Sequence, residues 1–314
     1  MMDNDVMISV IMGVYNQWNK EALMMAVSSI LQQSFKNFEF IIYDDGSCKE
    51  IAQQIRQLEA IDSRIVVIGR EENHGLAFSL NECIKHSRGK YIARMDADDI
   101  SHPDRLQIQY DFLEKNRDYQ WCGCNAVLFD ENGIWGERKM PEIPSNKDFL
   151  RFSPFIHPSV MYRREVFIEG EGYLDSKDTL RCEDYEIFMR LSRKGLKGYN
   201  LQYNLFEYRE SMDSYRRRKF VYRINEAKVR YKNFKGMGML FPIGWIYVLR
   251  PVIGGIVPYQ MIALLKRTEY RKVFSRAWWK DAEHELGLQI NEISKISETG
   301  LYNATGTANV SAAK

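Results

Sequence analysis

Residues 89–106 read GKYIARMDADDISHPDRL, and this stretch places three carboxylates at the end of a predicted strand. The apolar run YIARM ends in Asp96, Ala97, Asp98 and Asp99, and Ser-His-Pro-Asp then begins a predicted helix. Carboxylates held close together repel one another, which raises their pKa values unless a cation compensates. Mg²⁺ and Mn²⁺ prefer oxygen ligands, and Mg²⁺ usually binds one or two carboxylates together with substrate phosphates. The Asp-x-Asp pattern therefore predicts a divalent cation that bridges to a diphosphate.

A simpler interpretation of the same residues is structural. Asp98 or Asp99 would begin a turn, and Ser101 would cap the helix after Pro103. The DDGS stretch at 44–47 allows the same two interpretations, because Asp-Gly is a common turn pair. Taken alone, neither stretch decides between a structural role and a ligand-binding role.

Strands and helices alternate through the first 130 residues. Apolar, β-branched runs predict strands at 7–15, 38–45, 64–69, 90–96 and 121–130. Helical spacing of apolar residues predicts helices at 19–33, 49–60, 76–86 and 104–116. Alternation at this spacing indicates parallel βαβ units. The nearly continuous apolar strands indicate a sheet that is covered on both faces.

Four of these predicted strands carry informative residues at or just after their carboxyl ends. They are Gly13 to Asn16, Asp44 to Ser47, Glu72 to Gly75 and Asp96 to Asp99. Ligands of open α/β sheets bind beyond the carboxyl ends of the strands, so we expect these groups to converge on one cleft. The sequence holds neither a Gly-rich dinucleotide fingerprint nor a P-loop lysine motif, which disfavours those classes of nucleotide-binding protein.

The pattern changes after about residue 135. We expect a strand at 157–163, an amphipathic helix at 183–194, one or two strands within 196–209, and a basic helix at 214–235. The apolar segment 237–265 is cut by Pro242, Arg250, Pro251 and Pro258, so no uninterrupted run reaches the roughly 20 residues of a spanning helix. We favour a segment that lies at a membrane interface, and a buried packing segment or an inserted hairpin remain alternatives.

These patterns divide the chain into three parts. We expect a catalytic domain at 1–212, a helical basic and apolar extension at 213–298, and a disordered tail of small polar residues at 299–314. The formal net charge of +2 gives no indication of a nucleic-acid partner. Five scattered cysteines favour a reducing compartment, and the spacing of Cys122 and Cys124 does not fit a zinc pair. The N-terminal residues predict no secretory signal.

Five motifs in order resemble family 2 glycosyltransferases with the GT-A fold. They are ISVIMGVYN (8–16), DDGS (44–47), NHG (73–75), GKYIARMDADD (89–99) and EDYEIFMRL (183–191). The resemblance covers roughly residues 7–210. It implies an α/β GT-A fold with a mostly parallel sheet flanked by helices. It also implies a nucleotide-diphospho-sugar donor, a Mn²⁺ or Mg²⁺ cofactor, and transfer with inversion at the anomeric carbon.

The resemblance also assigns roles to residues of this chain. Val14 and Tyr15 are expected against the base, Asp45 in a hydrogen bond to the base with Asp44 beside it, and Asn73 and Gly75 along the nucleotide. Asp96 and Ala97 are expected at the ribose or donor sugar, Asp98 with Asp96 at the metal, and Arg94 and Asp99 as neighbours that set charge and geometry. Asp184 matches the catalytic base; the alternative is an acid that interacts with a helix dipole.

One position departs from the family pattern. Many relatives carry Tyr-Arg-x-His, whose histidine assists the metal or the diphosphate, whereas this chain has Ser211 at the histidine position. Either that ligand is absent, or water, Glu210 or the arginines at 216–218 replace it. His157 is open to two interpretations, as an active-site residue on the acceptor side or as a satisfied structural histidine.

The resemblance, the basic helix and segment 237–265 together suggest a bacterial enzyme in peripheral contact with the inner face of the cytoplasmic membrane. Each basic residue near anionic headgroups contributes about 1 kcal/mol. We expect a UDP-sugar donor of a hexose or N-acetylhexosamine, and a lipid-linked glycan acceptor for lipopolysaccharide, capsule or exopolysaccharide. The alternatives are a solvated basic face on a soluble enzyme, a catalytically weak sugar-nucleotide-binding homologue that acts as an assembly partner, and a nucleotidyltransferase. The missing Gly-rich basic N-terminal loop disfavours the last.

Overall fold

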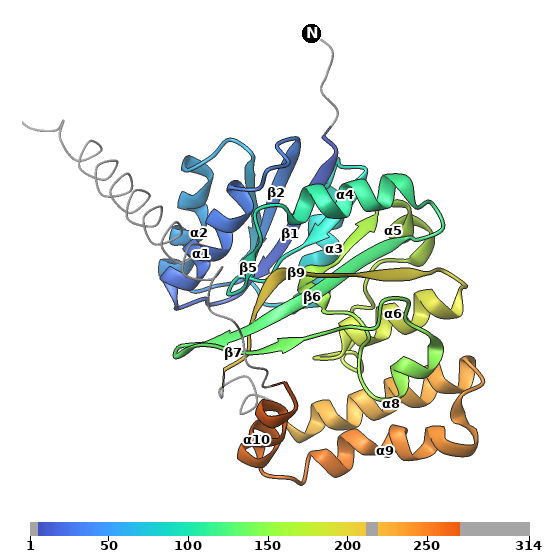
Figure 1. Ribbon diagram of the computed structural model, residues 1–314. Helices are drawn as coiled ribbons and strands as arrows, with labels where there is room; N and C mark the ends of the chain where they lie inside the picture. Colours follow the sequence, from blue (N-terminus) through green and yellow to red (C-terminus); the bar gives the residue numbers. More distant parts are fainter. Residues whose placement is uncertain (1–5, 212–218, 271–314) are drawn as a thin grey trace, which may run out of the picture. The chain divides into compact units, whose positions relative to one another are not determined.

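The computed structural model describes residues 6–211 and 219–270, which belong to one compact unit, Met1–Lys272 (Figure 1). Several predicted parts lie outside the described residues: the arginines at 216–218, the beginning of the expected helix 214–235, the part of the expected extension beyond residue 270, and the expected tail 299–314. The predicted boundary between residues 212 and 213 lies outside them as well.

Nine strands form one sheet in the order β3-β2-β1-β4-β8-β6-β9-β5, and β7 pairs with β6. The strands are β1 (Ile8–Val14), β2 (Phe38–Asp45), β3 (Ile65–Arg70), β4 (Tyr91–Arg94), β5 (Ile100–Ser101), β6 (Trp121–Asp130), β7 (Gly133–Arg138), β8 (Met161–Arg163) and β9 (Gly198–Arg209). The helices are α1 (Lys20–Leu31), α2 (Lys49–Gln57), α3 (Leu76–His86), α4 (Arg105–Lys115), α5 (Glu165–Gly170), α6 (Glu183–Arg193), α8 (Phe220–Gly236), α9 (Trp245–Gly254) and α10 (Tyr259–Tyr270).

Parallel pairing brings the carboxyl ends of the first strands together. Strands β3, β2, β1 and β4 are parallel neighbours, and the register places Val14 beside Asp44. Strand β8 pairs antiparallel with both β4 and β6, whereas β9 runs parallel to β6. The short strand β5 pairs antiparallel with β9, through Ile100 and Glu207 and through Ser101 and Phe206. The end of β9 is thereby brought next to the loop that joins β4 to β5.

Two hydrophobic cores cover the two faces of the sheet. On one face, alternate residues of β1 pack with apolar side chains of α1, α2 and α4. On the other face, Ile11 and Tyr43 pack with side chains of α3, α6 and α8, and Val248 of α9 joins this second core. Strands that bury both faces explain the nearly continuous apolar runs in the sequence.

The predicted strand at 157–163 is wrong over its first half. His157–Ser159 forms a 3-10 turn, and only Met161–Arg163 is a strand. Pro158 has no backbone N–H to give to a strand ladder, while Ser159 N donates to the Ile156 carbonyl at 2.9 Å and closes the turn. The expected region 196–209 contains the single strand β9, Gly198–Arg209. The elements β5, β7 and α5 are not predicted by the sequence patterns.

The apolar segment 237–265 folds into short pieces. A π-helical turn (Leu240–Gly244) with non-helical dihedral angles at Phe241 leads into α9, and α10 follows. Helix α8 packs against α6 and α9, and α10 packs against β7. Within the residues that the structure describes, no helix is long and apolar enough to cross a membrane.

Candidate active site

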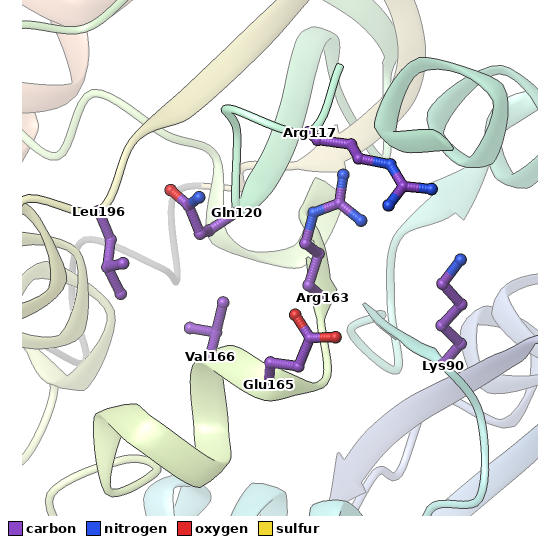
Figure 2. Close-up of a pocket in the computed structure, with 7 residues that line it drawn as sticks. All are labelled: Lys90, Arg117, Gln120, Arg163, Glu165, Val166 and Leu196. Atoms are coloured by element: carbon purple, nitrogen blue, oxygen red, sulfur yellow. The ribbon is translucent and has the colours of Figure 1, made fainter. Parts of the chain in front are cut away.

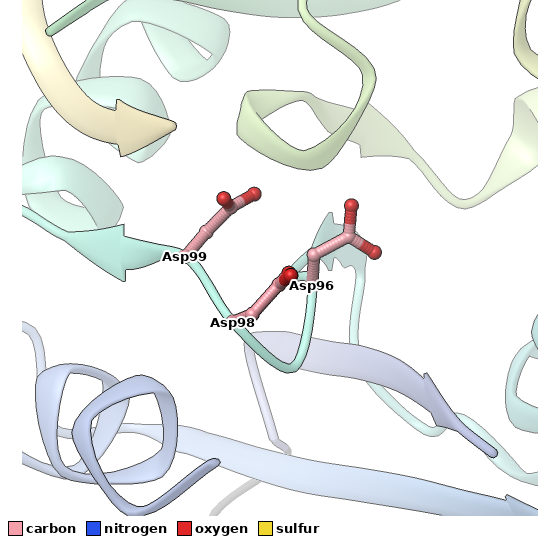
Figure 3. A group of neighbouring side chains, drawn as sticks. All are labelled: Asp96, Asp98 and Asp99. Carbon is pink, nitrogen blue, oxygen red and sulfur yellow. The ribbon is translucent and has the colours of Figure 1, made fainter. Parts of the chain in front are cut away.

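Three carboxylates gather on the loop between β4 and β5, residues 96–99, which we call the acid loop (Figure 3). One oxygen each of Asp96, Asp98 and Asp99 lies within 4.8 Å of the others. Asp99 is buried, whereas Asp96 and Asp98 are half-buried. The structure thus brings Asp99, predicted only as a neighbour, into the same cluster as the two predicted metal ligands.

Two buried arginines lie beneath the acid loop. Arg94, at the end of β4, places Nη2 2.6 Å from Asp96 Oδ1. Burial by itself would lower the pKa of Arg94, but the charge of Asp96 raises it above its ordinary value. Its Nε and Nη1 atoms are buried and have no hydrogen-bond partner within the described part of the chain. Arg94 is therefore charged, and part of its donor capacity is unused by the protein.

Arg105 is the second buried arginine, and the sequence analysis did not single it out. Its Nη2 donates to the Arg94 carbonyl at 3.0 Å and its Nη1 to the Pro158 carbonyl at 3.3 Å. Burial lowers the pKa of Arg105 to about 10. Its spacing from Leu106, Gln109 and Leu113 puts it on the buried face of α4, which is the signal that could have revealed it. This guanidinium ties the end of β4 to the 3-10 turn at 157–159.

Asp99 is held by the end of β9. Arg209 donates its backbone N–H to Asp99 Oδ1 at 2.7 Å, and its Nε donates to the Asp98 carbonyl at 2.9 Å. Burial raises the pKa of Asp99 well above its ordinary range, and the charges of Asp98 and Asp96 raise it further. Asp99 Oδ2 is buried with no hydrogen-bond partner among the described residues. An orphaned carboxylate oxygen within a three-carboxylate cluster fits a divalent cation that prefers oxygen ligands.

Asp45 organises the loop that follows β3. Its Oδ2 accepts from Asn73 Nδ2 at 2.8 Å and from Gly75 N at 2.7 Å, and its Oδ1 accepts from His74 N at 3.0 Å. Burial raises the pKa of Asp45, although the two backbone N–H groups oppose the shift. Gly75 has φ of +96°, a conformation that side chains disfavour. Three of the predicted nucleotide-side residues therefore form one hydrogen-bonded unit.

The other predicted nucleotide-side residues border this unit. Val14 is buried at the end of β1, whereas the Tyr15 side chain is 53% exposed. Gln17 Nε2 donates to the carbonyl of Ala97 at 3.4 Å and so joins the first loop to the acid loop. Asp44 is buried and its Oδ1 caps the next turn by accepting from Ser47 N at 3.0 Å. The predicted residues at the ends of β1, β2 and β4 therefore share one edge of the sheet.

Asp184 lies in the first turn of α6, with Glu183 before it. The Asp184 carboxylate lies near enough to Tyr162 and Tyr173 to raise the pKa of both hydroxyls, after the larger effect of burial. Burial, and then the charge of Asp184, raises the pKa of Glu183 to about 7, and Arg94 opposes this shift. The charge of Arg94 therefore acts both on the acid loop and on the residues around Asp184, the predicted catalytic base.

His157 has the environment of a structural histidine. It is buried, and its Nε2 lies 2.8 Å from the Tyr173 hydroxyl. Burial lowers the pKa of His157 well below its ordinary value, and the nearby charge of Arg94 lowers it further. The imidazole is therefore neutral at physiological pH, and this supports the structural alternative for His157.

Ser211 follows the end of β9 and is half-buried. Glu210, one of the residues suggested as a replacement for the missing histidine, is buried beside it and pairs with Lys266 Nζ of α10 at 2.8 Å. The sequence analysis gave Lys266 no role at this site. Because Lys266 is 56 residues away along the chain, no local pattern could have connected the two.

A separate pocket of about 320 Å³ lies at the opposite end of β4 (Figure 2). It is lined by Lys90, Arg117, Gln120, Arg163, Glu165, Val166 and Leu196. Arg163 already donates to the Tyr119 carbonyl at 3.0 Å and to the Tyr91 hydroxyl at 3.2 Å. None of the residues predicted for donor binding lines this pocket, and the Arg163 guanidinium is occupied by structural hydrogen bonds.

Comparison with known proteins identifies the class. The model of the family described as Glycosyl transferase family 2 matches residues 9–170. EpsE of Bacillus subtilis (strain 168), which bears a glycosyltransferase name, is 36% identical over 277 residues, covering 88% of this chain and 97% of EpsE. The O-antigen biosynthesis glycosyltransferase WbnJ of Escherichia coli is 33% identical over 208 residues, covering 65% of this chain and 79% of WbnJ.

Solved structures share the fold at low identity. TarS 1-349 of S. aureus in complex with UDP-GlcNAc has a TM-score of 0.56 and 14% identity, covering 87% of this chain and 95% of that chain. The mannosyltransferase PcManGT of Pyrobaculum calidifontis, in complex with GDP-Man and Mn²⁺, has a TM-score of 0.56 and 14% identity, covering 90% and 80%. The predicted α/β GT-A fold is confirmed. The chain belongs to glycosyl transferase family 2.

Proposed function

We propose that this glycosyltransferase is inverting and metal-dependent, and that it transfers a hexose or N-acetylhexosamine from a UDP-sugar to a lipid-linked glycan in bacterial polysaccharide synthesis. The observation that carries the proposal is the acid loop, which lies over buried Arg94 at the edge where the ends of β1, β2 and β4 meet. The pathway is supported by relatives named for O-antigen and amylovoran biosynthesis. The donor class is supported by the UDP-GlcNAc complex of TarS.

Asp96, Asp98 and Asp99 are the residues that would hold the cation. A bound Mn²⁺ or Mg²⁺ would act as a Lewis acid and stabilise the charge that develops on the leaving nucleoside diphosphate. Arg94 pairs with Asp96 through a contact of 2.6 Å and so fixes the position of this carboxylate. The unused Nε and Nη1 donors of Arg94 would then be available to oxygen atoms of the donor.

Asp184 is proposed to be the catalytic base. An acceptor hydroxyl is a poor nucleophile, and a carboxylate within hydrogen-bond reach takes its proton as the new bond forms. Attack on one face of the sugar while the diphosphate leaves from the other inverts the anomeric carbon. The half-buried position of Asp184 in the first turn of α6 supports this role, since the residue is accessible to a polar ligand.

The base and ribose would bind between the ends of β1, β2 and β3. We assign Val14 and Tyr15 to the base, Asp44 and Asp45 with Asn73 and Gly75 to the nucleotide side, and Ala97 to the donor sugar. The exposed ring of Tyr15 supports stacking against a base. Both carboxylate oxygens of Asp45 accept hydrogen bonds from residues 73–75, so this loop is held in place. Asp45 would therefore contact the base from within an ordered loop.

Helices α9 and α10 belong to the extension that is predicted to begin near residue 213. We propose that they lie against the inner membrane surface. Between Gly236 and Leu265 the chain has no acidic residue and a single basic one, Arg250. Exposed side chains on α9 and α10 form what we call the apolar face: Ile246, Leu249, Ile253, Met261, Leu264 and Leu265. A group of exposed apolar side chains such as this one marks an interaction site. Peripheral contact would bring the enzyme to a lipid-linked acceptor.

A donor screen tests the proposed reaction. The purified full chain is incubated with a panel of sugar nucleotides, with and without Mn²⁺, and release of nucleoside diphosphate is measured. Metal-dependent hydrolysis of one donor is the expected result and would name the sugar. Donor binding without turnover, even when lipid-linked acceptors are added, would instead support the sugar-nucleotide-binding homologue that the Ser211 departure suggests.

A further inference from the structure

Two carbonyl groups of one turn, two residues apart, are held by different helices. The Phe149 carbonyl accepts a hydrogen bond from the Tyr185 hydroxyl of α6. The Arg151 carbonyl accepts one from Arg250 Nη1 of α9. Because neighbouring α-carbons of a chain are about 3.8 Å apart, the Arg250 guanidinium lies close to the Tyr185 hydroxyl. Tyr185 directly follows Asp184, so a cation of the C-terminal extension lies near the proposed catalytic base.

The charges around Tyr185 agree with this arrangement. Burial raises the pKa of the Tyr185 hydroxyl, and the charge of Arg230 opposes this shift. Arg250 and Asp184 also act on the hydroxyl, Arg250 lowering its pKa and Asp184 raising it. One hydroxyl is therefore within electrostatic reach of both Arg250 and the proposed base.

Arg250 also borders the apolar face. It lies four residues after Ile246 and three before Ile253, and residues at these spacings are neighbours on the surface of a helix. Its side chain is exposed, as are those of Ile246 and Ile253. Between Gly236 and Leu265 it is the single basic residue. The position of this charge, between the apolar face and α6, therefore needs an explanation.

The chemistry of a lipid-linked acceptor supplies one. When a glycan is joined to a lipid through a phosphate ester, the charged group lies between the lipid chain and the sugar. With the lipid against the apolar face and the sugar at Asp184, the phosphate would lie beside Arg250. A guanidinium presents a planar set of donors that matches phosphate oxygens, and hydrogen bonds between charged groups are the strong ones. Arg151, which is also exposed, adds a second cation next to the first.

We propose that Arg250, with Arg151 beside it, binds the phosphate groups of an acceptor in which a glycan is joined to a lipid through a phosphate or diphosphate ester. The inference rests on the proposed function and deepens it, because it names the chemical link within the acceptor and the residues that recognise it. No bond forms or breaks at this site. Its role is to hold the acceptor so that the sugar reaches the proposed base.

The test measures sedimentation of the full chain with two kinds of phosphatidylcholine vesicle, without donor. One kind contains a polyprenyl diphosphate, and the other contains phosphatidylglycerol at the same total negative charge. The buffer contains EDTA, so that no cation on the acid loop can bind the diphosphate. The wild-type chain should bind the diphosphate vesicles at least about fivefold more tightly than the phosphatidylglycerol vesicles.

Three variants separate the charge of Arg250 from its contact with the turn. Arg250→Gln should lose most of the preference for diphosphate vesicles, although its amide can still donate to the Arg151 carbonyl. Arg250→Lys, which keeps the positive charge, should retain part of the preference. Arg56→Gln, at an exposed position of α2, is the matched control and should retain all of it.

Two results would overturn the inference. The first is absent or equal binding of the wild-type chain to the two kinds of vesicle, because the surface would then have no specific affinity for the diphosphate. The second is a full preference in Arg250→Gln. Failure of the proposed function would appear elsewhere, as the absence of donor turnover in the sugar-nucleotide screen, whereas vesicle binding requires neither donor nor metal.

Discussion

Nη2 of Arg94 lies 2.6 Å from Oδ1 of Asp96, so a fully buried cation holds the first carboxylate of the acid loop. The pair joins the end of a core strand to a half-buried carboxylate of the proposed metal site. Because Arg94 is itself tied down by Arg105 through its carbonyl oxygen, the carboxylate has a rigid support. Rigid support of this kind lowers the cost of assembling a binding site around a charged ligand.

Arg94→Gln should weaken donor binding. A hydrogen bond to a charged group contributes about 1.5–3 kcal/mol, which corresponds to a rise of about tenfold to a hundredfold in donor KM. Steady-state kinetics at saturating Mn²⁺ would measure it. Arg117→Gln, an exposed arginine beside the separate pocket, is the matched control and should leave KM unchanged. An unchanged KM in Arg94→Gln would remove Arg94 from the donor site.

Asp184→Asn should abolish transfer while donor binding stays near normal. General-base catalysis contributes about 10²–10⁴-fold, so kcat should fall by that factor. Donor affinity is measured separately by calorimetry. Asp178→Asn, an exposed acid in the segment before α6, provides the control. If Asp184→Asn keeps most of its activity, the assignment of the base is wrong.

Asp45→Asn should loosen the loop at 73–75. The substituted amide cannot accept all three hydrogen bonds, so the free energy of unfolding should fall by about 1–3 kcal/mol. Urea denaturation measures this change, and donor KM should rise with it. Asp118→Asn, at an exposed position between α4 and β6, should change neither quantity. Equal stability of Asp45→Asn and wild type would contradict the hydrogen-bonded unit described here.

The raised pKa of Glu183, about 7, predicts two effects of pH. A carboxyl whose pKa is raised in the folded state binds its proton more tightly there, so its contribution to stability is lost as pH rises towards 7. Glu183→Gln should therefore match wild type in thermal unfolding at pH 4 and exceed it at pH 8. Because Glu183 loses its proton near pH 7 beside Asp184, wild-type kcat/KM should change through pH 7, and Glu183→Gln should lack this change. If the unfolding temperatures of Glu183→Gln and wild type differed by the same amount at pH 4 and at pH 8, the raised pKa of Glu183 would be refuted.

The apolar face should bind anionic lipid. Ile246, Leu249 and Ile253 are 66%, 52% and 60% exposed, so their joint replacement by serine costs little folding stability. Burial of an isoleucine or leucine contributes about 1.5–3 kcal/mol, so sedimentation with phosphatidylglycerol vesicles should weaken by about tenfold or more per side chain. Ile143→Ser, an exposed position in the loop after β7, is the control. Vesicle binding that survives the triple substitution would rule out this face.

Sequence patterns predicted the elements whose signals are local. Strands β1, β2 and β6 are long apolar runs, and the ends of β1, β2 and β4 carry the polar groups that the sheet brings to one edge. The motif order predicted the family and the GT-A fold, and the comparisons confirm both. The roles of individual site residues stay predictions, which the substitutions above test.

The features that the sequence patterns did not predict depend on contacts between residues far apart in the chain. Strand β5 has two residues and exists because Ile100 and Ser101 pair with Glu207 and Phe206, more than 100 positions along the chain. Arg105 is buried only because carbonyl oxygens of β4 and of the 157–159 turn meet its guanidinium. Helical spacing places Arg105 on the buried face of α4, but no local pattern names its partners or those of β5, since these contacts form only when the chain closes on itself.

Because α10 is attached to the ends of the strands, it constrains recombination between related enzymes. The family match ends at residue 170, before Asp184, Arg209 and Lys266. A hybrid that joined this catalytic half to another protein's C-terminal helices would lose the pairs that Lys266 makes with Glu210 and Arg267 makes with Asp130. These pairs should consequently be inherited together through recombination, and natural or engineered chimaeras with a junction between β9 and α10 should be less stable than either parent.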